Sequence, residues 1–385
     1  MKPLKKSTLL LSFLLILLLA STSLAKETGN KGQQPIVLKT MGSLYFGGTV
    51  SSDNDGETFH GDHGYAQYFI PKNSRTYPLV MWHGLGQSGR TWETTPDGRE
   101  GFMQILPRQD WSVYIIDQPR RGRAGRTQAT FADPNAIPTT ARESAAWSVF
   151  RLGTWNPPNG PTFFPGVQFP QDAASIEQFL RQQTPNTGDE PSPSVEHRDF
   201  MADTMVDLFR QIGPGILITH SRSGQYGWAT AMKQPELIKA IVAYEPGAFA
   251  FPEDEPPVDI ATDNDLLKKS QAPQLVPKED FLKLTKMPIL VVFGDNIAKT
   301  PSSIYGVELW RMDIERAKQF VEAVNRHGGD AVLVELPEFG IHGNTHFPFA
   351  DLNNVEIADY LTKFLKSKGL DGRNNPHSGP GKKAI

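Results

Sequence analysis

Short runs of apolar residues recur along the chain, and most of them contain β-branched and aromatic residues in unbroken succession. Runs of this kind are typical of strands that are buried on both faces of a sheet. Two earlier runs, Gly42–Thr49 and Tyr65–Ile70, alternate apolar and polar positions more, which indicates an antiparallel start of the sheet. The six runs predicted as buried strands are Tyr77–Trp82, Trp111–Asp117, Gly215–His220, Ala240–Tyr244, Pro288–Phe293 and Ala331–Leu336.

Between these runs lie segments whose apolar residues recur at the spacing of one helix face. Strands that alternate with helices predict a mainly parallel sheet covered by helices on both faces, so the expected fold class is α/β. No internal repeat interrupts this alternation. The predicted helices are roughly Glu100–Leu106, Phe200–Ile212, Gly224–Lys233, Leu309–His327 and Val355–Lys366.

Two long insertions interrupt the alternation of strands and helices. The first runs from about residue 120 to residue 198, and the second, from Phe251 to about Gln274, is acidic and rich in proline. A long irregular stretch inside a compact domain is typical of a lid or binding loop. The aromatic residues of the first insertion could equally form its own small core. They are Trp147, Phe150, Trp155, Phe163, Phe164 and Phe169.

The first 25 residues have the order of a secretory signal peptide. Three lysines precede an apolar run from Leu9 to Ala20, and small residues follow at Ser23 and Ala25. The apolar run is about 12 residues long, whereas a helix that spans a membrane needs roughly 20, which disfavours the alternative of an uncleaved anchor. We therefore expect cleavage after Ala25, a secreted or periplasmic protein, and no stable membrane anchor.

Composition excludes several classes of function. The chain has 385 residues, and its 39 Lys and Arg against 42 Asp and Glu give a formal net charge of −3. There is no basic face that would indicate nucleic acid as a partner. The absence of cysteine excludes a thiol nucleophile and cysteine-ligated zinc. Residues 26–36 and 368–385 are expected to be flexible tails.

A glycine pattern follows the first buried strand. Gly84, Gly86 and Gly89 have the G-x-G-x-x-G spacing of a dinucleotide-binding loop, and Asp117 closes the next strand. However, the residues after Gly89 are polar and do not begin an apolar helix. His83-Gly84 directly after a strand is also typical of the loop that supplies an oxyanion hole. The second interpretation is favoured, so no cofactor is expected.

The stretch "ITHSRSGQ" at 218–225 resembles the strand-to-helix turn that presents a catalytic serine, although neither outer position of the G-x-S-x-G pattern is glycine. Such a turn needs small side chains two residues before and two residues after the nucleophile. Thr219 and Ser223 meet this condition if Ser221 is the nucleophile. If Ser223 were the nucleophile, the bulky Gln225 would not. A serine that only caps a helix is the non-catalytic alternative.

Two histidines follow the last predicted strand and are candidates for the base. His346 lies closer than His342 to the final helix, where the order serine, acid, histidine places the base, and is preferred. His60 and His63 resemble a metal pair, but no third ligand is evident, so no metal site is expected.

A carboxylate must orient the imidazole of a catalytic histidine. Glu245 and Asp295 both follow strands after Ser221, and both lie at the edge of the sheet where active sites of this architecture form. Position along the chain slightly favours Asp295. The mechanics of the sequence alone do not separate the two acids.

Seven segments together resemble the α/β-hydrolase superfamily and, within it, a group of secreted bacterial esterases typified by an Alcaligenes esterase. They cover most of the chain from residue 80 to the final helix. The segments are "HG" at 83–84, "TWETTPDGREGF" at 91–102, "YIIDQPRRGRAG" at 114–125, "THSRSG" at 219–224, "YEPG" at 244–247, "VVFGD" at 291–295 and "GNTHF" at 343–347.

The resemblance implies an α/β-hydrolase domain over residues 26–367, with a cap insertion at about 120–198. It also implies an esterase with Ser221 as nucleophile, His346 as base and Glu245 as acid, acting on a small-molecule ester. Backbone N–H groups of Leu85 and Arg222 are the expected oxyanion donors. The alternatives are another acyl-transfer enzyme, such as a lipase, amidase or acyltransferase, and a non-catalytic exported binding protein.

Overall fold

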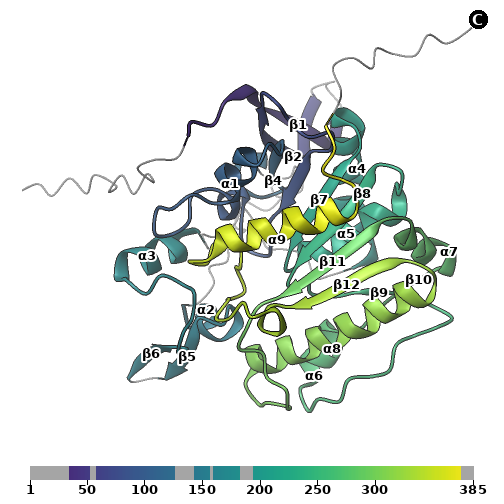
Figure 1. The fold of residues 1–385 in the computed structure, drawn as a ribbon. Helices are drawn as coiled ribbons and strands as arrows, with labels where there is room; N and C mark the ends of the chain where they lie inside the picture. The colour runs from purple at the N-terminus through teal and green to yellow at the C-terminus, as the bar shows by residue number, and fades with distance from the viewer. Residues whose placement is uncertain (1–33, 53–57, 126–142, 157–158, 183–193, 374–385) are drawn as a thin grey trace, which may run out of the picture. The chain divides into compact units, whose positions relative to one another are not determined.

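Eight strands form one central sheet in the order β1-β2-β4-β3-β7-β8-β11-β12 (Figure 1). The computed structural model describes residues 34–52, 58–125, 143–156, 159–182 and 194–373. Neighbouring strands pair in parallel from β4 to β12, whereas β2 is antiparallel to both β1 and β4. The strands are β1 (Leu38–Ser52), β2 (Thr58–Pro71), β3 (Leu79–Trp82), β4 (Val113–Asp117), β7 (Gly215–His220), β8 (Ile238–Tyr244), β11 (Pro288–Phe293) and β12 (Asp330–Glu335).

The predicted α/β class and all eight predicted strands are confirmed, including the antiparallel start. The five predicted helices are also present, with ends displaced by a few residues. The largest differences are at the beginnings of two of them, which start at 195 instead of 200 and at 305 instead of 309. The helices are α1 (Phe102–Arg108), α4 (Val195–Ile212), α5 (Ser223–Lys233), α8 (Tyr305–Arg326) and α9 (Asn354–Ser367).

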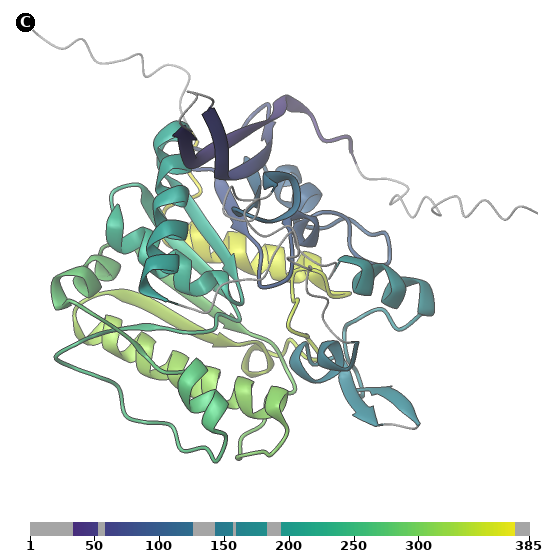
Figure 2. The same ribbon diagram turned by 180° about the vertical axis from the view of Figure 1, so that it is seen from behind.

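The two faces of the sheet carry separate apolar clusters. Along β7, Leu217 belongs to one cluster, while Ile216 and Ile218 belong to the other, as the two-residue period of a strand requires. Helices α4, α5 and α8 supply the first cluster, and α1 and α9 supply the second. Figure 1 accordingly shows α9 in front of the central strands, and Figure 2 shows α4 and α5 in front of them.

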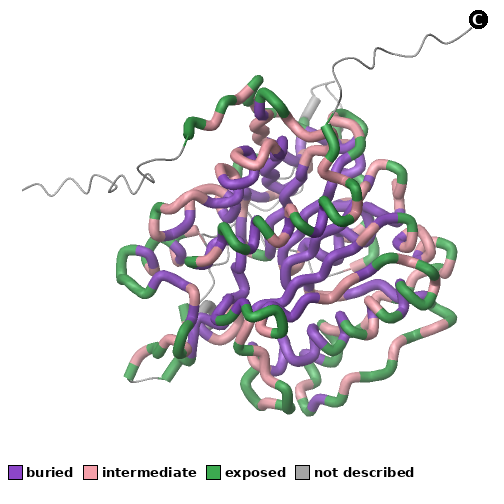
Figure 3. The backbone as a smooth tube through the Cα atoms, in the orientation of Figure 1, coloured by how far each residue is buried: buried purple, intermediate pink, exposed green. Residues whose placement is uncertain are grey.

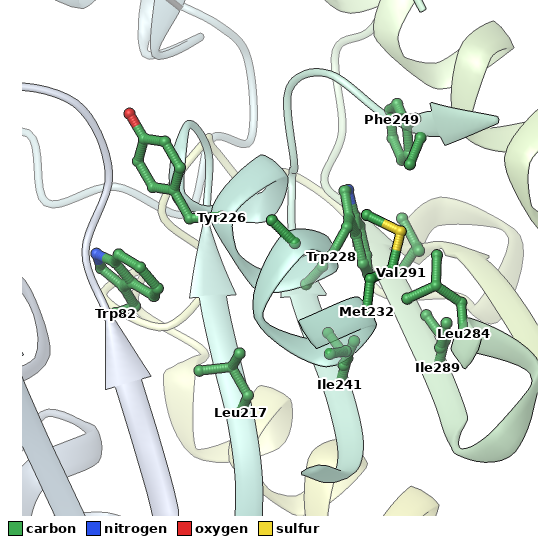
Figure 4. Close-up of a cluster of buried hydrophobic side chains, with 14 of the residues drawn as sticks. Trp82, Leu217, Tyr226, Trp228, Met232, Ile241, Phe249, Leu284, Ile289 and Val291 are labelled. Carbon is green, nitrogen blue, oxygen red and sulfur yellow. The ribbon is translucent and has the colours of Figure 1, made fainter. Parts of the chain in front are cut away.

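The central strands are buried along almost their whole length, as the purple tube in Figure 3 shows. On the α5 side, Trp228 lies over β8 and β11 among Met232, Ile241 and Val291 (Figure 4). Its ring also lies 4.8 Å from that of Phe320 on α8. A sheet that is covered in this way holds its strand ends in fixed positions. The residues at the base of each following loop are therefore fixed as well.

The first insertion contains α2 (Glu143–Val149), a hairpin of β5 (Gly153–Asn156) and β6 (Gly160–Phe163), and α3 (Ala173–Gln182). Its aromatic residues continue the α9-side cluster, except Trp155, which is exposed. Phe169 and Phe179 are fully buried, and Phe179 packs against Phe347 of the main domain. This favours the core interpretation of the insertion's aromatic residues.

The second insertion follows β8 and contains two short parallel strands, β9 (Ala250–Pro252) and β10 (Gln274–Val276), with α6 (Asp265–Ser270) between them. Helix α7 (Lys278–Phe281) and the 3₁₀ turn η4 (Leu282–Lys286) then lead into β11. The insertion therefore has regular structure at its base, where the sequence predicted only an irregular acidic stretch.

The predicted C-terminal tail begins too early. Residues 368–373 lie against the start of β3, where the N–H of Thr76 donates to the carbonyl of Gly372 and the Arg75 side chain donates to the carbonyl of Asp371. An arginine and a short backbone bridge thus hold a segment whose glycines and polar residues suggested flexibility. The predicted signal peptide and residues 374–385 lie outside the described residues. Within the described residues, no helix combines the length and apolarity needed to cross a membrane.

Replacing Trp228 by alanine is expected to lower the free energy of unfolding by about 3–5 kcal/mol, because the indole is fully buried between the sheet and α8. Leu266→Ala is the control, because Leu266 is 72% exposed, and it should change the stability by less than about 0.5 kcal/mol. Chemical denaturation of both variants checks the difference. Equal losses would contradict this account of the core.

Candidate active site

The carboxyl ends of four neighbouring strands meet at one edge of the sheet. His83 follows β3, Ser221 follows β7, Glu245 follows β8, and Gly294 follows β11. His346 reaches the same edge from the loop that leads from β12 to α9. Ligands and substrates of parallel sheets bind at this edge, because the loops there are free to vary while the strands fix their bases.

Ser221 occupies a strained turn between β7 and α5. Its φ angle is 53°, in the left-handed region that side chains disfavour. The turn is held because the N–H of Ser221 donates to the carbonyl of Tyr244 over 3.0 Å. The carbonyl of Ser221 in turn accepts from the N–H groups of Gly224 and Gly247, over 3.0 and 3.2 Å.

Glycines allow this turn, but at positions after the serine. A Cβ atom on Gly224 would lie 2.5 Å from the Cβ of Pro246, and one on Gly227 would lie 2.8 Å from the Cγ2 of Thr219. The first turns of α5 therefore pack directly against the ends of β7 and β8. Ser223 is buried, and its hydroxyl accepts the N–H of His220 over 2.9 Å. This close packing explains why residues 219 and 223 must be small. It also requires a small residue at Gly227, which the sequence pattern did not single out.

His346 is buried and is oriented by contacts on several sides. Its Nδ1–H donates to Oε2 of Glu245 over 2.6 Å. Its backbone N–H donates to the carbonyl of Phe150, and its carbonyl accepts from Nε2 of His220 over 2.9 Å. The Phe150 ring stacks on the imidazole, with the planes 8° apart. Nδ1 is thereby committed to the carboxylate, which leaves Nε2 as the basic nitrogen.

The sequence pattern did not decide between Glu245 and Asp295 as the acid, and in the structure the two lie against different histidines. Asp295 contacts His342, with 3.6 Å between Oδ2 and Nδ1, and accepts the N–H of Gly343. The His342 side chain is 67% exposed. Asp295 therefore shapes the loop before His346, whereas Glu245 contacts His346 itself.

Glu245 has an unexpected partner in the first insertion. Both terminal nitrogens of Arg151 donate to the carboxylate, one of them over 2.7 Å to Oε2. The N–H of Gly294 donates to Oε1 over 2.7 Å. Sequence reasoning missed Arg151, because a single arginine in an irregular insertion carries no motif, and only the folded chain places it beside an acid 94 residues away.

The charges at the site offset one another. Burial raises the pKa of Glu245, but the Arg151 guanidinium and the hydrogen bond from His346 outweigh it and lower the pKa to about 2. Burial lowers the pKa of His346, and Arg151 lowers it further, while Glu245 raises it. The result is an ionised carboxylate beside a neutral imidazole at neutral pH, which is the state in which an imidazole can accept a proton.

A network of charged groups fixes the loop that carries His346. Arg99 donates to the carbonyls of Ala350, Asp351 and Leu352. Asp351 is buried and accepts the backbone N–H and the hydroxyl of Thr345, over 2.7 and 2.8 Å. The segment "TWETTPDGR" thus contributes to the site by holding the histidine loop.

The loop after β3 is fixed in a similar way. Oδ1 of Asp117 accepts the N–H of Gly89 over 2.6 Å, and Oδ2 accepts both the N–H and the side chain of Arg123. Residues 89–92 form a single 3₁₀ turn, η1 (Gly89–Trp92). The dinucleotide pattern therefore lacks the helix on which a pyrophosphate would bind.

Gly84, which precedes the expected oxyanion donor Leu85, lies close to the serine, because a Cβ on Gly84 would lie 3.0 Å from the Cβ of Ser221. Arg222 follows Ser221 directly and has helical backbone angles at the N-terminus of α5. His60 and His63 lie on β2, and the described part of the chain contains no group of three or more metal-ligating side chains that could hold an ion.

The fold and the arrangement of the strand ends have a counterpart among solved structures. A novel bacterial esterase solved at atomic resolution matches with a TM-score of 0.70 and 29% sequence identity, over 87% of this chain and 98% of that chain. The chain has the α/β-hydrolase fold.

No protein-family model matches this chain. A fungal protein (Fungal sp.) named probable secreted lipase phiG is 27% identical to it in an alignment of 330 positions that covers 79% of this chain and 86% of that protein. One relative is thus named an esterase and the other a lipase, and both names support a carboxylic-ester hydrolase.

Gly227→Ala is expected to destabilise the protein by about 1–3 kcal/mol, because the added methyl group meets Cγ2 of Thr219. The double variant Thr219→Ser, Gly227→Ala should recover most of this loss, since serine lacks that methyl group. Denaturant unfolding measures both. Gly372→Ala is the control, because a Cβ there meets nothing within 4 Å. A double variant as unstable as the single one would show that the contact with Thr219 is not the cause.

Proposed function

We propose that the protein is an exported serine esterase that forms an acyl-enzyme on Ser221. The observation that carries the proposal is the meeting, at one edge of the sheet, of a serine with a φ of 53° and a buried His346–Glu245 pair joined over 2.6 Å. A strained serine after a strand presents its hydroxyl to substrate, and the paired imidazole supplies the base that it needs.

The reaction proceeds in two acyl transfers. Neutral His346 accepts the proton of the Ser221 hydroxyl as its oxygen attacks the ester carbonyl, and Glu245 stabilises the imidazolium that forms. His346 then protonates the leaving alcohol, which departs and leaves the acyl group on Ser221. A water molecule, activated by the same imidazole, attacks the acyl group and releases the carboxylic acid and the free serine.

Backbone N–H groups of Leu85 and Arg222 stabilise the tetrahedral intermediates. Both belong to loops at the serine: one follows β3, and the other begins α5. One donor of this kind contributes about 2.7–4 kcal/mol to the transition state of acyl transfer. The relative named as a secreted lipase supports export, and it makes longer-chain esters the second substrate class to test.

A fluorophosphonate is expected to label the wild-type protein on Ser221 and to leave Ser221→Ala unlabelled, because phosphonylation requires the activated hydroxyl. Intact-protein mass spectrometry, followed by peptide mapping, measures the adduct. Ser223→Ala is the matched control two residues away and should be labelled if it folds. An adduct on Ser221→Ala, or an unlabelled wild type, would falsify the nucleophile assignment.

Glu245→Gln is expected to lower kcat for p-nitrophenyl acetate by several powers of ten, towards the 10⁴-fold that is seen when a triad acid loses its charge. Asp295→Asn should change kcat far less, because Asp295 contacts His342 and not His346. Steady-state hydrolysis over p-nitrophenyl esters of increasing chain length tests the acid and the esterase or lipase preference together. A large loss in Asp295→Asn alone would reverse the choice of acid.

A further inference from the structure

Arg151 connects the first insertion to the acid of the site. It lies just after α2, is almost fully buried, and has a φ of 58°, so its backbone is strained in the same sense as that of Ser221. Its guanidinium forms a two-pronged ion pair with Glu245, its Nε donates to the carbonyl of Asp295 over 2.9 Å, and it lies over the ring of Trp310.

The backbone around Arg151 is held on both sides. The carbonyl of Val149 accepts the indole N–H of Trp310, and the carbonyl of Phe150 accepts the N–H of His346 over 3.0 Å. The carbonyl of Leu152 accepts the N–H of Phe164, also over 3.0 Å. These bonds hold the guanidinium against Glu245 at a defined position and angle, as a bidentate arginine–carboxylate pair requires.

We propose that Arg151 is a positioning residue of the hydrolytic reaction, which acts through Glu245 to hold the carboxylate in place and to balance its charge in front of His346. The inference rests on the proposed function of Ser221, His346 and Glu245. A lone buried carboxylate would strongly stabilise the imidazolium form of His346, whereas a carboxylate already paired with a guanidinium stabilises it less.

Other ionisable groups surround the same pair: Asp313 and Asp351 interact with Glu245, and His220, which His83 adjoins, interacts with His346. Asp313 on α8 and Asp351 in the loop before α9 are buried, and burial raises the pKa of each carboxyl group. His220 and His83 lie at the ends of β7 and β3, and burial lowers the pKa of His220. Among the described residues, the side chains that pair with Glu245 are Arg151 and His346, so removal of Arg151 leaves His346 as its side-chain partner there.

Arg151→Met tests the role through the pH dependence of kcat/KM for p-nitrophenyl acetate. Loss of the cation raises the pKa values of both His346 and Glu245, so the base remains protonated to higher pH. The acidic limb of the profile should therefore move upward by about one pH unit. The plateau value of kcat/KM should fall by roughly 10–100-fold, the size of loss that follows when a partner that orients a metal-ligating side chain is removed.

Arg311→Met is the matched control, because Arg311 forms another buried two-pronged ion pair, with Glu308 on α8. It should lower the Tm as the loss of a buried pair does, yet leave the acidic limb where the wild type has it. An unmoved limb in folded Arg151→Met, or an equal movement in Arg311→Met, would overturn the proposal.

Two further measurements keep the test independent of folding and of activity. If Arg151→Met does not fold, Arg151→Lys is the second variant, because lysine keeps the charge but cannot form a two-pronged pair with the carboxylate. It should lower the plateau of kcat/KM without moving the acidic limb of the pH profile. An unchanged plateau would contradict the positioning role. NMR titration of the His346 ring in wild type and variant follows its pKa directly, without substrate, and an unshifted titration would also overturn the inference. A wild type that neither hydrolyses the ester nor reacts with fluorophosphonate would instead refute the proposed function.

Discussion

The carboxylate of Glu245 is the point at which the separate parts of the molecule are joined. It follows β8, accepts a backbone N–H from the end of β11, pairs with Arg151 of the first insertion, and receives Nδ1–H of His346 from the loop before α9. A buried carboxylate is tolerable only if its oxygens are fully hydrogen-bonded, and here four donors satisfy it. The need to satisfy one desolvated charge therefore ties the first insertion and the histidine loop to the paired strands β8 and β11.

Around the site, apolar packing and polar contacts have different roles. Apolar packing on both faces of the sheet sets where the strands end, and polar or charged groups then fix the loops beyond those ends. Asp117 holds the loop after β3, Arg99 and Asp351 hold the histidine loop, and Gly224 and Gly227 let α5 begin close against the strands. Burial alone gives no direction to a side chain, whereas hydrogen bonds do, so the two kinds of interaction supply stability and geometry respectively.

The sequence predicted the sheet, its helices and its antiparallel start because buried strands and amphipathic helices each produce a characteristic spacing of apolar residues within a short stretch of chain. It also singled out Ser221 and preferred His346, since both sit at recognisable junctions between elements. It could not separate Glu245 from Asp295, which end adjacent strands, β8 and β11; that distinction depends on which loop each carboxylate faces. Arg151 could not be predicted, because its partner Glu245 lies far along the chain and an ion pair between distant segments produces no periodic pattern in the sequence. The tail at 368–373 was misjudged because a few contacts to Arg75 outweigh its polar, glycine-containing composition.

The attachment of the first insertion at Val149, Phe150 and Leu152 bears on how such a protein can change over evolutionary time. Caps that merely cover a binding site can be lengthened, shortened or exchanged while the machinery beneath them is untouched. An insertion that contributes a charge to Glu245 and a carbonyl to His346 lacks that freedom near its base. Variation in substrate preference would then be confined to the parts of the insertion away from these residues, and transfer of the insertion between relatives would succeed only where an equivalent arginine accompanies it.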